Sequence, residues 1–262
     1  MGKTVRKVCC LSRAADGEEI VETMQVLVTL NNIGMCSLPI GYHHIQQSAI
    51  YSLIMGDLHD HGAVYEKRDY KLFTFSPFKG KYRIQDKRIT FLDSISFEVR
   101  FVNEQVAETF AENIQTKGFR LGDVTFHNVM TQVYHRIISE NSLMIKMLSP
   151  ICVYQTDENK HTNYLNPGEA LFYRYIMENF ERKYQAYYGI KPESSIELTN
   201  IKYSMKDKYF TKYKNFFIEA WYGLYLLEGN ADYLSFLYDA GLGSKNAQGF
   251  GMFEPQKSRS IS

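Results

Sequence analysis

The sequence predicts an α+β protein with two domains in tandem. Segments that alternate apolar and polar residues, as strands do, are interleaved with segments of helical spacing, in the order strand–helix–strand–strand–helix–strand. The same order recurs, more loosely, in the second half of the chain. The length of 262 residues suits two domains of about 130 residues each. The repeated order is that of the ferredoxin-like fold.

In the first half, a sharp strand pattern begins at Met24, and an apolar stripe that includes Ile45 and Ala49 indicates a helix. Asn103 and Gly118 are typical of the two ends of a second helix. We expect strand 24–31, helix 44–55, a loop over 56–70, strands 72–76, 82–92 and 96–102 with a turn at 93–94, helix 104–117 and strand 124–138.

In the second half, Pro167 is well placed at a first helical position. We expect strand 143–154 with a bend at Ser149–Pro150, helix 167–188, strands 196–204 and 215–226, helix 231–240 and a last strand at 251–253. The predicted organisation is a flexible N-terminal extension (1–23), a first ferredoxin-like domain (24–140), a second such domain with a glycine-rich loop (141–255) and a tail (256–262).

The composition is that of an ordinary globular protein, with 45% hydrophobic and 23% charged residues. The sequence has no apolar run of the ~18 residues that a membrane-spanning helix needs. Its first thirteen residues lack the apolar core of a secretory signal. Its four cysteines (Cys9, Cys10, Cys36 and Cys152) have neither a zinc-site spacing nor a plausible disulfide pattern. We therefore expect a cytoplasmic protein that contacts no membrane.

The net charge is only +1, but its distribution is uneven. Residues 65–88 contain eight Lys and Arg against three acids, and residues 200–214 contain five Lys against one Asp. Two basic segments on an otherwise acidic chain could form a stripe for a phosphate backbone. The alternative is that these are ordinary solvated lysines.

The most specific local pattern is the glycine segment GLGSKNAQGFG at 241–251. Glycine lets a ligand approach the main chain closely, so Lys245 and the free amides of this loop could face phosphates. A dinucleotide-binding loop is not expected, because only eleven residues follow and they include Pro255. A P-loop is excluded because the Gly-Lys-Ser order is absent. The alternative interpretation is a glycine-rich β-hairpin.

A second pattern is the segment LHDHG at 58–62, between the first helix and a basic stretch. His59 and His61 could bind a metal, but the sequence offers no third ligand at a suitable spacing. Histidine beside basic residues suits general acid–base chemistry better, because its ordinary pKa is roughly 6.5. Surface histidines without a task are the alternative. Tyr51 is a core residue by default, although its phenol could reach the same pocket.

These pieces in this order resemble the Cas6 family of CRISPR repeat-processing endoribonucleases, a branch of the repeat-associated RNA-binding superfamily that is built on paired ferredoxin-like domains. The resemblance extends over most of residues 24–255. The segments that carry it are Leu38–Tyr42, Ile45–Tyr51, Leu58–Gly62, Lys71–Ser76, Leu148–Ile151 and the glycine loop 241–251.

The resemblance implies metal-independent cleavage of the repeat in a CRISPR precursor transcript, without a cofactor, to give guide RNAs. The ribose 2′-hydroxyl attacks the scissile phosphate, leaving 2′,3′-cyclic phosphate and 5′-hydroxyl ends. By position, His59 matches the family's acid–base catalyst, Lys71 a charge-stabilising lysine and Tyr51 a tyrosine that orients or transfers a proton. His61 could share the task of His59 or take it over. This mechanism requires one of the two imidazoles to lie beside Lys71.

The implied partner is CRISPR repeat RNA, while homodimer formation and association with an interference complex stay open. The RNA contacts are expected from the basic segment and the glycine loop: Lys67, Arg68, Lys81, Arg83, Lys87, Arg88, Gly241, Gly243, Ser244, Lys245, Asn246, Gln248, Gly249 and Gly251. The main alternative is a non-catalytic RNA-binding or scaffold subunit of the same superfamily. A small-molecule enzyme on the same scaffold is disfavoured, because nothing in the sequence marks a closed apolar pocket.

Overall fold

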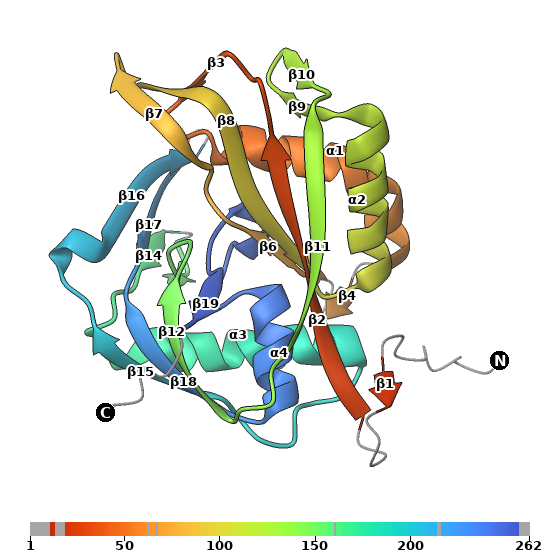
Figure 1. Cartoon of the computed structure of the whole chain (residues 1–262). Helices are drawn as coiled ribbons and strands as arrows, with labels where there is room; N and C mark the ends of the chain where they lie inside the picture. Colours follow the sequence, from red (N-terminus) through yellow and green to blue (C-terminus); the bar gives the residue numbers. More distant parts are fainter. Residues whose placement is uncertain are drawn as a thin grey trace, which may run out of the picture.

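The computed structural model describes residues 11–13, 19–61, 63–65, 68–159, 161–213 and 216–256 (Figure 1). Side chains are described from residue 23 onward within these ranges, except over 55–69. The chain forms an α+β fold of tandem ferredoxin-like domains, as predicted, and the two domains stand one above the other in Figure 1.

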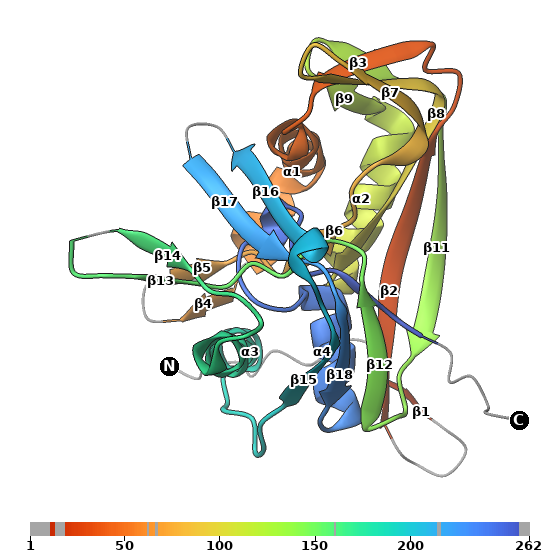
Figure 2. The same ribbon diagram turned by 90° about the vertical axis from the view of Figure 1, so that its left-hand side faces the viewer.

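The first domain contains one strand–helix–strand–strand–helix–strand unit. Its elements are β2 (Glu19–Leu30), α1 (His43–His61), β6 (Phe73–Phe75), β8 (Arg88–Phe101), α2 (Glu104–Lys117) and β11 (Val129–Ile137). The strands pair in the order β11-β2-β8-β6, and every neighbouring pair is antiparallel. Both helices cover the same face of this sheet (Figure 2).

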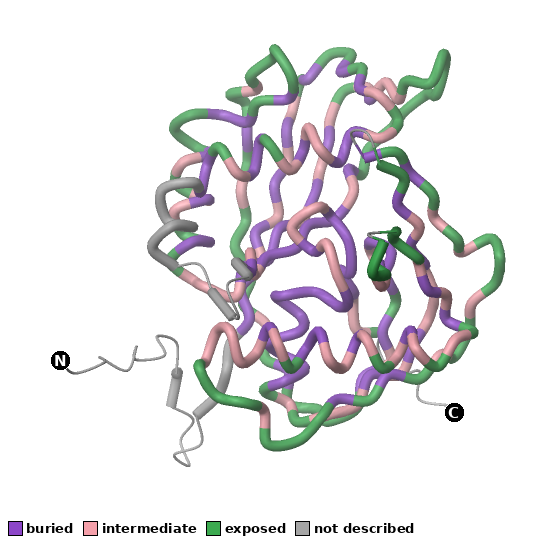
Figure 3. The backbone as a smooth tube through the Cα atoms, turned by 180° about the vertical axis from the view of Figure 1, so that it is seen from behind, coloured by how far each residue is buried: buried purple, intermediate pink, exposed green. Residues whose placement is uncertain are grey.

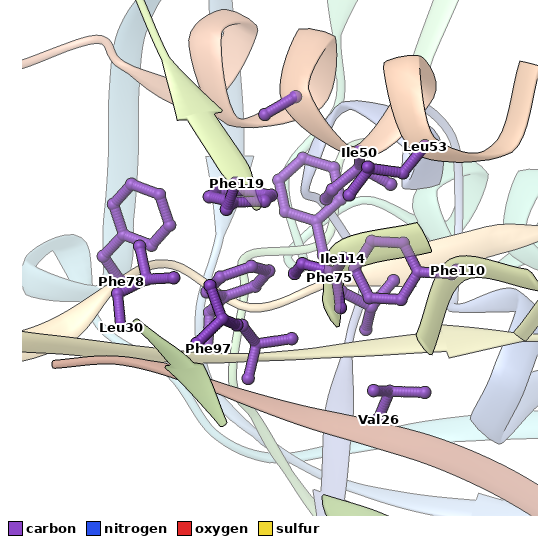
Figure 4. Packing of buried hydrophobic residues seen from close by; sticks show 14 of the residues in the cluster. Val26, Leu30, Ile50, Leu53, Phe75, Phe78, Phe97, Phe110, Ile114 and Phe119 are labelled. Atoms are coloured by element: carbon purple, nitrogen blue, oxygen red, sulfur yellow. The ribbon is translucent and has the colours of Figure 1, made fainter. Parts of the chain in front are cut away.

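Alternation along the strands explains why this face is the core. Val26 and Leu30 of β2 are fully buried, as is Phe97 on β8. Phe110 and Ile114 of α2 pack onto them, and their spacing of four residues along the helix is that of a buried stripe (Figure 4). The aromatic surplus of the sequence is therefore largely a core feature.

The second domain repeats the unit with the same strand order. Its elements are β12 (Ser142–Met147), α3 (Ala170–Tyr188), β15 (Glu197–Lys202), β18 (Leu224–Glu228), α4 (Ala231–Ala240) and β19 (Phe253–Pro255). The strands pair in the order β15-β18-β12-β19. The chain passes from the first sheet to the second between β11 and β12, which is where we place the domain boundary.

Short hairpins are added to both units. They consist of β4 (Ala63–Tyr65) with β5 (Arg68–Tyr70), β9 (Phe119–Leu121) with β10 (Val124–Phe126), β13 (Tyr154–Thr156) with β14 (Thr162–Tyr164), and β16 (Lys208–Tyr213) with β17 (Phe216–Trp221). Single turns of 3-10 helix lie at Met205–Asp207 and Asn246–Gln248. The expected strands at 124–138 and 215–226 are thus each two strands, and the expected strand at 143–154 ends at Met147.

Three further boundaries differ from the prediction. Helix α1 continues to His61 instead of ending at 55, and β4 and β5 occupy part of the expected loop 56–70. The hairpin turn lies at Asp86–Lys87, both with positive φ, and not at 93–94, so β8 is continuous and pairs with β3 (Met35–Pro39) and β7 (Lys79–Gln85). Strand β2 begins at Glu19 and pairs with β1 (Leu11–Arg13), so these parts of the expected flexible extension are strand.

A buried charged network joins the two domains. The Arg100 guanidinium, whose side chain is fully buried, donates to the Phe253 carbonyl at 2.6 Å and pairs with Glu98 and Glu254, each at 3.1 Å. It also lies 3.7 Å from the ring centroid of Tyr238 on α4. The buried residues run through the centre of the molecule, where the domains meet (Figure 3).

Candidate functional site

The structure brings Tyr51 and the beginning of β6 together. Tyr51 lies on α1, and its ring meets the Phe73 ring edge-on with centroids 5.4 Å apart. Phe73 follows Lys71 by two residues, and both Tyr51 and Lys71 are half-buried. Two of the four predicted catalytic residues are therefore on neighbouring segments.

The other two predicted catalytic residues lie on the last turns of α1. His59 is eight residues after Tyr51, which corresponds to about 12 Å along the helix axis. The side chains of His59 and His61 lie outside the described residues, so their expected position beside Lys71 stays a prediction. Of the predicted RNA contacts, Lys67 lies outside the described residues, and Arg68 is described only as backbone in β5.

The glycine loop (241–251) lies between the two domains. At Gly249, φ is +87°, and an added Cβ would fall 2.7 Å from the Phe75 ring and 2.9 Å from the His43 ring. At Gly251, φ is +77°, and an added Cβ would collide with the Leu242 carbonyl oxygen. Glycine is required at both positions for close approach to the protein itself.

Two side chains stabilise the glycine loop, and the sequence analysis assigned this role to neither of them. The Asn246 side-chain amide donates to the carbonyls of Leu242 and Phe250, at 2.9 and 3.0 Å. The Lys183 ammonium, on α3 and only 4% exposed as a residue, donates to the carbonyls of Gly241 and Gly243, both at 2.9 Å. Asn246 was predicted as an RNA contact but is itself buried. Lys183 lies 58 residues before the loop, so no local pattern could have indicated it.

Several loop amides that were expected to face phosphates are used internally. The amides of Gly241, Ser244, Gly249 and Gly251 donate to carbonyls of the protein at 2.8–2.9 Å. The expectation of free amides is therefore wrong for these four, because they bond to Leu237 of α4, to Asn246 in the loop itself, and to Pro150 and Cys152. Ser244, Lys245 and Gln248 are half-buried. The Lys245 ammonium lies 4.7 Å from the Tyr154 ring centroid.

Hydrogen bonds connect the loop to α1 beside Tyr51. The Tyr213 hydroxyl on β16 donates to the Gln47 side-chain oxygen, and the Gln47 amide donates to the Ala247 carbonyl at 2.6 Å. Gln47 and Tyr51 are four residues apart, so they share one face of α1. Burial raises the pKa of Tyr213 to about 12, so this hydroxyl is a stable hydrogen-bond donor at neutral pH.

The strand register brings the remaining basic residues together on the β7–β8 hairpin. Lys81 and Arg83 share a face with Arg88, which donates to the Ser37 hydroxyl at 2.9 Å and the Ser37 carbonyl at 2.6 Å. Lys87 occupies the turn. This hairpin extends from the upper end of the first sheet, away from β4 and β5 (Figures 1 and 2). The basic residues of segment 65–88 that the structure describes therefore lie on two separate hairpins, β4–β5 and β7–β8, and on the segment between them.

Groups of three or more His, Cys, Asp or Glu that could hold a metal do not occur among the residues that the structure describes. Within the same residues, α1 to α4 include no helix with the length and hydropathy to span a membrane.

Comparison with known proteins shows that the chain is similar to CRISPR-associated proteins. Residues 131–255 match the family model described as CRISPR associated protein Cas6, C-terminal. A relative from Methanocaldococcus jannaschii named CRISPR-associated endoribonuclease Cas6 1 is 26% identical over 247 residues, which cover 88% of this chain and 92% of the relative. A relative from Pyrococcus furiosus named CRISPR-associated endoribonuclease Cas6 is 27% identical over 220 residues, 82% of each chain.

Solved structures agree on the fold. One described as CRISPR associated protein Cas6 has a TM-score of 0.74 at 23% identity, over 90% of this chain and 100% of that one. Another, described as a Cas6 product complex, has a TM-score of 0.61 at 14% identity, over 90% and 99%. The solved structures show a fold of tandem ferredoxin-like domains, and residues 131–255 match the Cas6 C-terminal family. Most of the chain is similar to Cas6 proteins, in line with the resemblance of its motifs.

Proposed function

We propose that this protein is a metal-independent endoribonuclease that cleaves CRISPR repeat RNA in precursor transcripts and releases guide RNAs in the cytoplasm. The observation that best supports this proposal is the likeness, over more than four fifths of the chain, to two relatives that are named endoribonucleases. The contact of Tyr51 with Phe73, which puts α1 beside the segment that begins at Lys71, also supports it.

The proposed reaction is an in-line transesterification. The 2′-hydroxyl next to the scissile phosphate loses its proton and attacks phosphorus, and the 5′-oxygen leaves with a proton, so 2′,3′-cyclic phosphate and 5′-hydroxyl ends result. His59, or His61 in its place, transfers one of these protons. The Lys71 ammonium stabilises the charge that gathers on the phosphorane, and Tyr51 orients the phosphate or transfers the second proton.

RNA binding is proposed to come from the β7–β8 hairpin and from the surface residues of the glycine loop. Lys81, Arg83, Lys87 and Arg88 supply phosphate contacts on one element, and Lys245 supplies a cation at the loop. The four loop glycines of the predicted set, Gly241, Gly243, Gly249 and Gly251, shape the loop, while the half-buried Ser244 and Gln248 are proposed to supply further contacts there.

The test is a cleavage assay of repeat RNA by the wild type and by His59→Ala, His61→Ala, Lys71→Ala and Tyr51→Phe. Removal of the acid–base histidine should slow cleavage by about 10²–10⁴-fold with nearly unchanged RNA affinity. Stable binding of the repeat by the wild type without any cut would contradict the proposal and favour the non-catalytic subunit. Full activity of both histidine variants would refute the assignment of the histidines alone.

A further inference from the structure

The outer face of the β16–β17 hairpin presents an aromatic pair to solvent. The rings of Phe210 and Phe217 stack with centroids 5.1 Å apart and an interplanar angle of 15°. Each of these residues is 56% exposed. Large apolar side chains that gather on a surface indicate an interaction site more often than scattered ones do. Because the two rings already stack on each other, a planar group of a partner could stack on the exposed side of either ring.

The register of the hairpin explains why the pair faces outward. Thr211 pairs with Ile218, and both are buried on the inner face at 8% and 2% exposure. Phe210 and Phe217 belong to the alternate positions and therefore to the opposite face. The inner face anchors the hairpin to the protein, so the outer face is a supported surface and not a loose loop.

The hairpin that carries this surface lies beside the proposed catalytic helix, which its opposite, inner face contacts. Tyr213 on β16 donates to Gln47, which shares a face of α1 with Tyr51. The ring of Tyr209, also on β16, lies 6.0 Å from that of His43 at the beginning of α1. Figure 2 shows β16 and β17 on the same side of the molecule as α1, β4 and β5. A strand of RNA that leaves the catalytic helix on this side meets the hairpin.

The charge around the pair fits a polyanion. Lys212 is exposed and directly opposite Phe217 in the register. Lys208 pairs with Glu219 at 2.7 Å on the same face. Lys202 and Lys206 are exposed on the preceding segment. Exposed aromatic rings among lysines are the combination that binds single-stranded nucleic acid, because the rings stack bases and the cations contact phosphates.

We infer that the Phe210–Phe217 pair is a stacking platform for unpaired bases of the RNA, outside the catalytic centre. This inference rests on the proposed function, since RNA is the ligand, but it adds a site that cleavage itself does not require. A base stacks on the exposed side of a phenylalanine ring, while Lys212 contacts a neighbouring phosphate. Stacking of this kind tolerates any base sequence, so the platform holds the RNA without selecting it.

The test uses the double variant Phe210→Leu/Phe217→Leu, which keeps apolar area and removes the rings. Its affinity is measured by fluorescence anisotropy with two probes: repeat RNA carrying a 2′-deoxy group at the cleavage site, and an oligouridylate of equal length. We expect about tenfold weaker binding of both probes, the equivalent of one lost base stack. The double Trp variant at the same positions should restore binding. Tyr134→Leu, a change at an exposed aromatic residue on β11 (43% exposed), is the control and should have no effect.

Unchanged affinity of the Leu variant, while the wild type binds and cleaves, would overturn the platform and leave the proposed function intact. Ring-dependent RNA binding by a wild type that does not cut the repeat would support the platform and contradict the proposed nuclease. A wild type that binds neither probe would overturn both. A change of oligomeric state in the Leu variant, seen by light scattering, would overturn the platform in favour of an interface between copies.

Discussion

A buried ammonium group helps the Asn246 side chain to hold the glycine loop in its shape. Lys183 donates to the carbonyls of Gly241 and Gly243, which would otherwise lie in the interior without a donor at this position. An unsatisfied buried carbonyl costs about 1–3 kcal/mol. Lys183 is therefore a positioning residue: it shapes the loop that carries Lys245 and has no need to touch RNA.

Lys183→Met should lower the free energy of unfolding by about 1–3 kcal/mol or more, because it removes the donor of two buried carbonyls. Chemical denaturation measures this change. Lys183→Arg keeps a charged donor and should recover part of the loss. Lys245→Met is the control at the loop surface, where weaker RNA binding is expected at unchanged stability. A Lys183→Met protein as stable as the wild type would contradict this role.

His43 makes stability depend on pH. Burial lowers the pKa of His43 to about 4, and among the described residues neither of its ring nitrogens has a hydrogen-bond partner. The ordinary pKa of about 6.5 applies to the unfolded chain. Between these two values the unfolded state binds more protons, so the contribution that is present above pH 6.5 is lost as the pH falls toward 4.

His43→Phe should therefore reduce the loss of stability between pH 7 and pH 5.5 by about 1 kcal/mol relative to the wild type. Denaturation curves at both pH values measure the difference. Burial raises the pKa of Asp239, an effect of the opposite sign, but it is present in both proteins and cancels. The same pH dependence in variant and wild type would show that His43 is not the group responsible.

Among the elements, the β7–β8 hairpin contains four of the basic residues that the sequence suggested as RNA contacts: Lys81, Arg83, Lys87 and Arg88. All seven residues of β7 are exposed, and Lys81 and Arg83 share their face with Arg88. A two-stranded arm with cations on one face can follow a phosphate backbone. Because the arm is separate from the proposed catalytic helix, it should contribute to affinity and not to the chemical step.

Lys81→Met and Arg83→Met should each weaken RNA binding and lower the slope of log affinity against log salt by about 0.7, the value for one phosphate contact on single-stranded RNA. The rate of cleavage at saturating RNA should stay unchanged. Titrations at several salt concentrations check the slope, and Lys117→Met on α2 is the control. A fall in the saturated cleavage rate without a change of slope would contradict the assignment to binding.

The sequence predicted the type and order of the helices and strands better than the residues at which they begin and end. Strict alternation in β2 and the capping residues of α2 are local signals, and these elements were predicted within a few residues, apart from the earlier start of β2. Helix α1 passes through Gly56, where the loop 56–70 was expected to begin, although glycine costs about 1 kcal/mol inside a helix. The short hairpins β4–β5 and β13–β14 carry too few residues for a periodic pattern.

At the scale of the whole molecule, the site depends on contacts between distant segments. The resemblance assigned Tyr51 and Lys71 to one catalytic site, whereas the contact of Tyr51 with Phe73 and the roles of Lys183, Gln47 and Tyr213 become visible only in the fold. Arg100 and Glu254 join the two domains in the same way. A pattern along the chain contains no information on which buried donor will meet which carbonyl, because that depends on how the domains pack.

The two proposed binding elements, the β7–β8 hairpin and the glycine loop, lie in different parts of the molecule (Figures 1 and 2). The glycine loop lies between the domains, α1 passes above it, and the hairpins β4–β5, β13–β14 and β16–β17 extend to one side (Figure 2). The central claim is that the nucleophile belongs to the RNA itself, because only a 2′-hydroxyl allows transesterification without activated water.

The most direct measurement compares two repeat RNAs incubated with the protein in excess EDTA, one all-ribose and one with a single 2′-deoxy substitution at the nucleotide preceding the cut. The account predicts that the first is cut to give a 2′,3′-cyclic phosphate and a 5′-hydroxyl, and that the second is bound but stays whole. Cleavage of the deoxy-substituted RNA at the same position, or loss of all cleavage in EDTA, would contradict it.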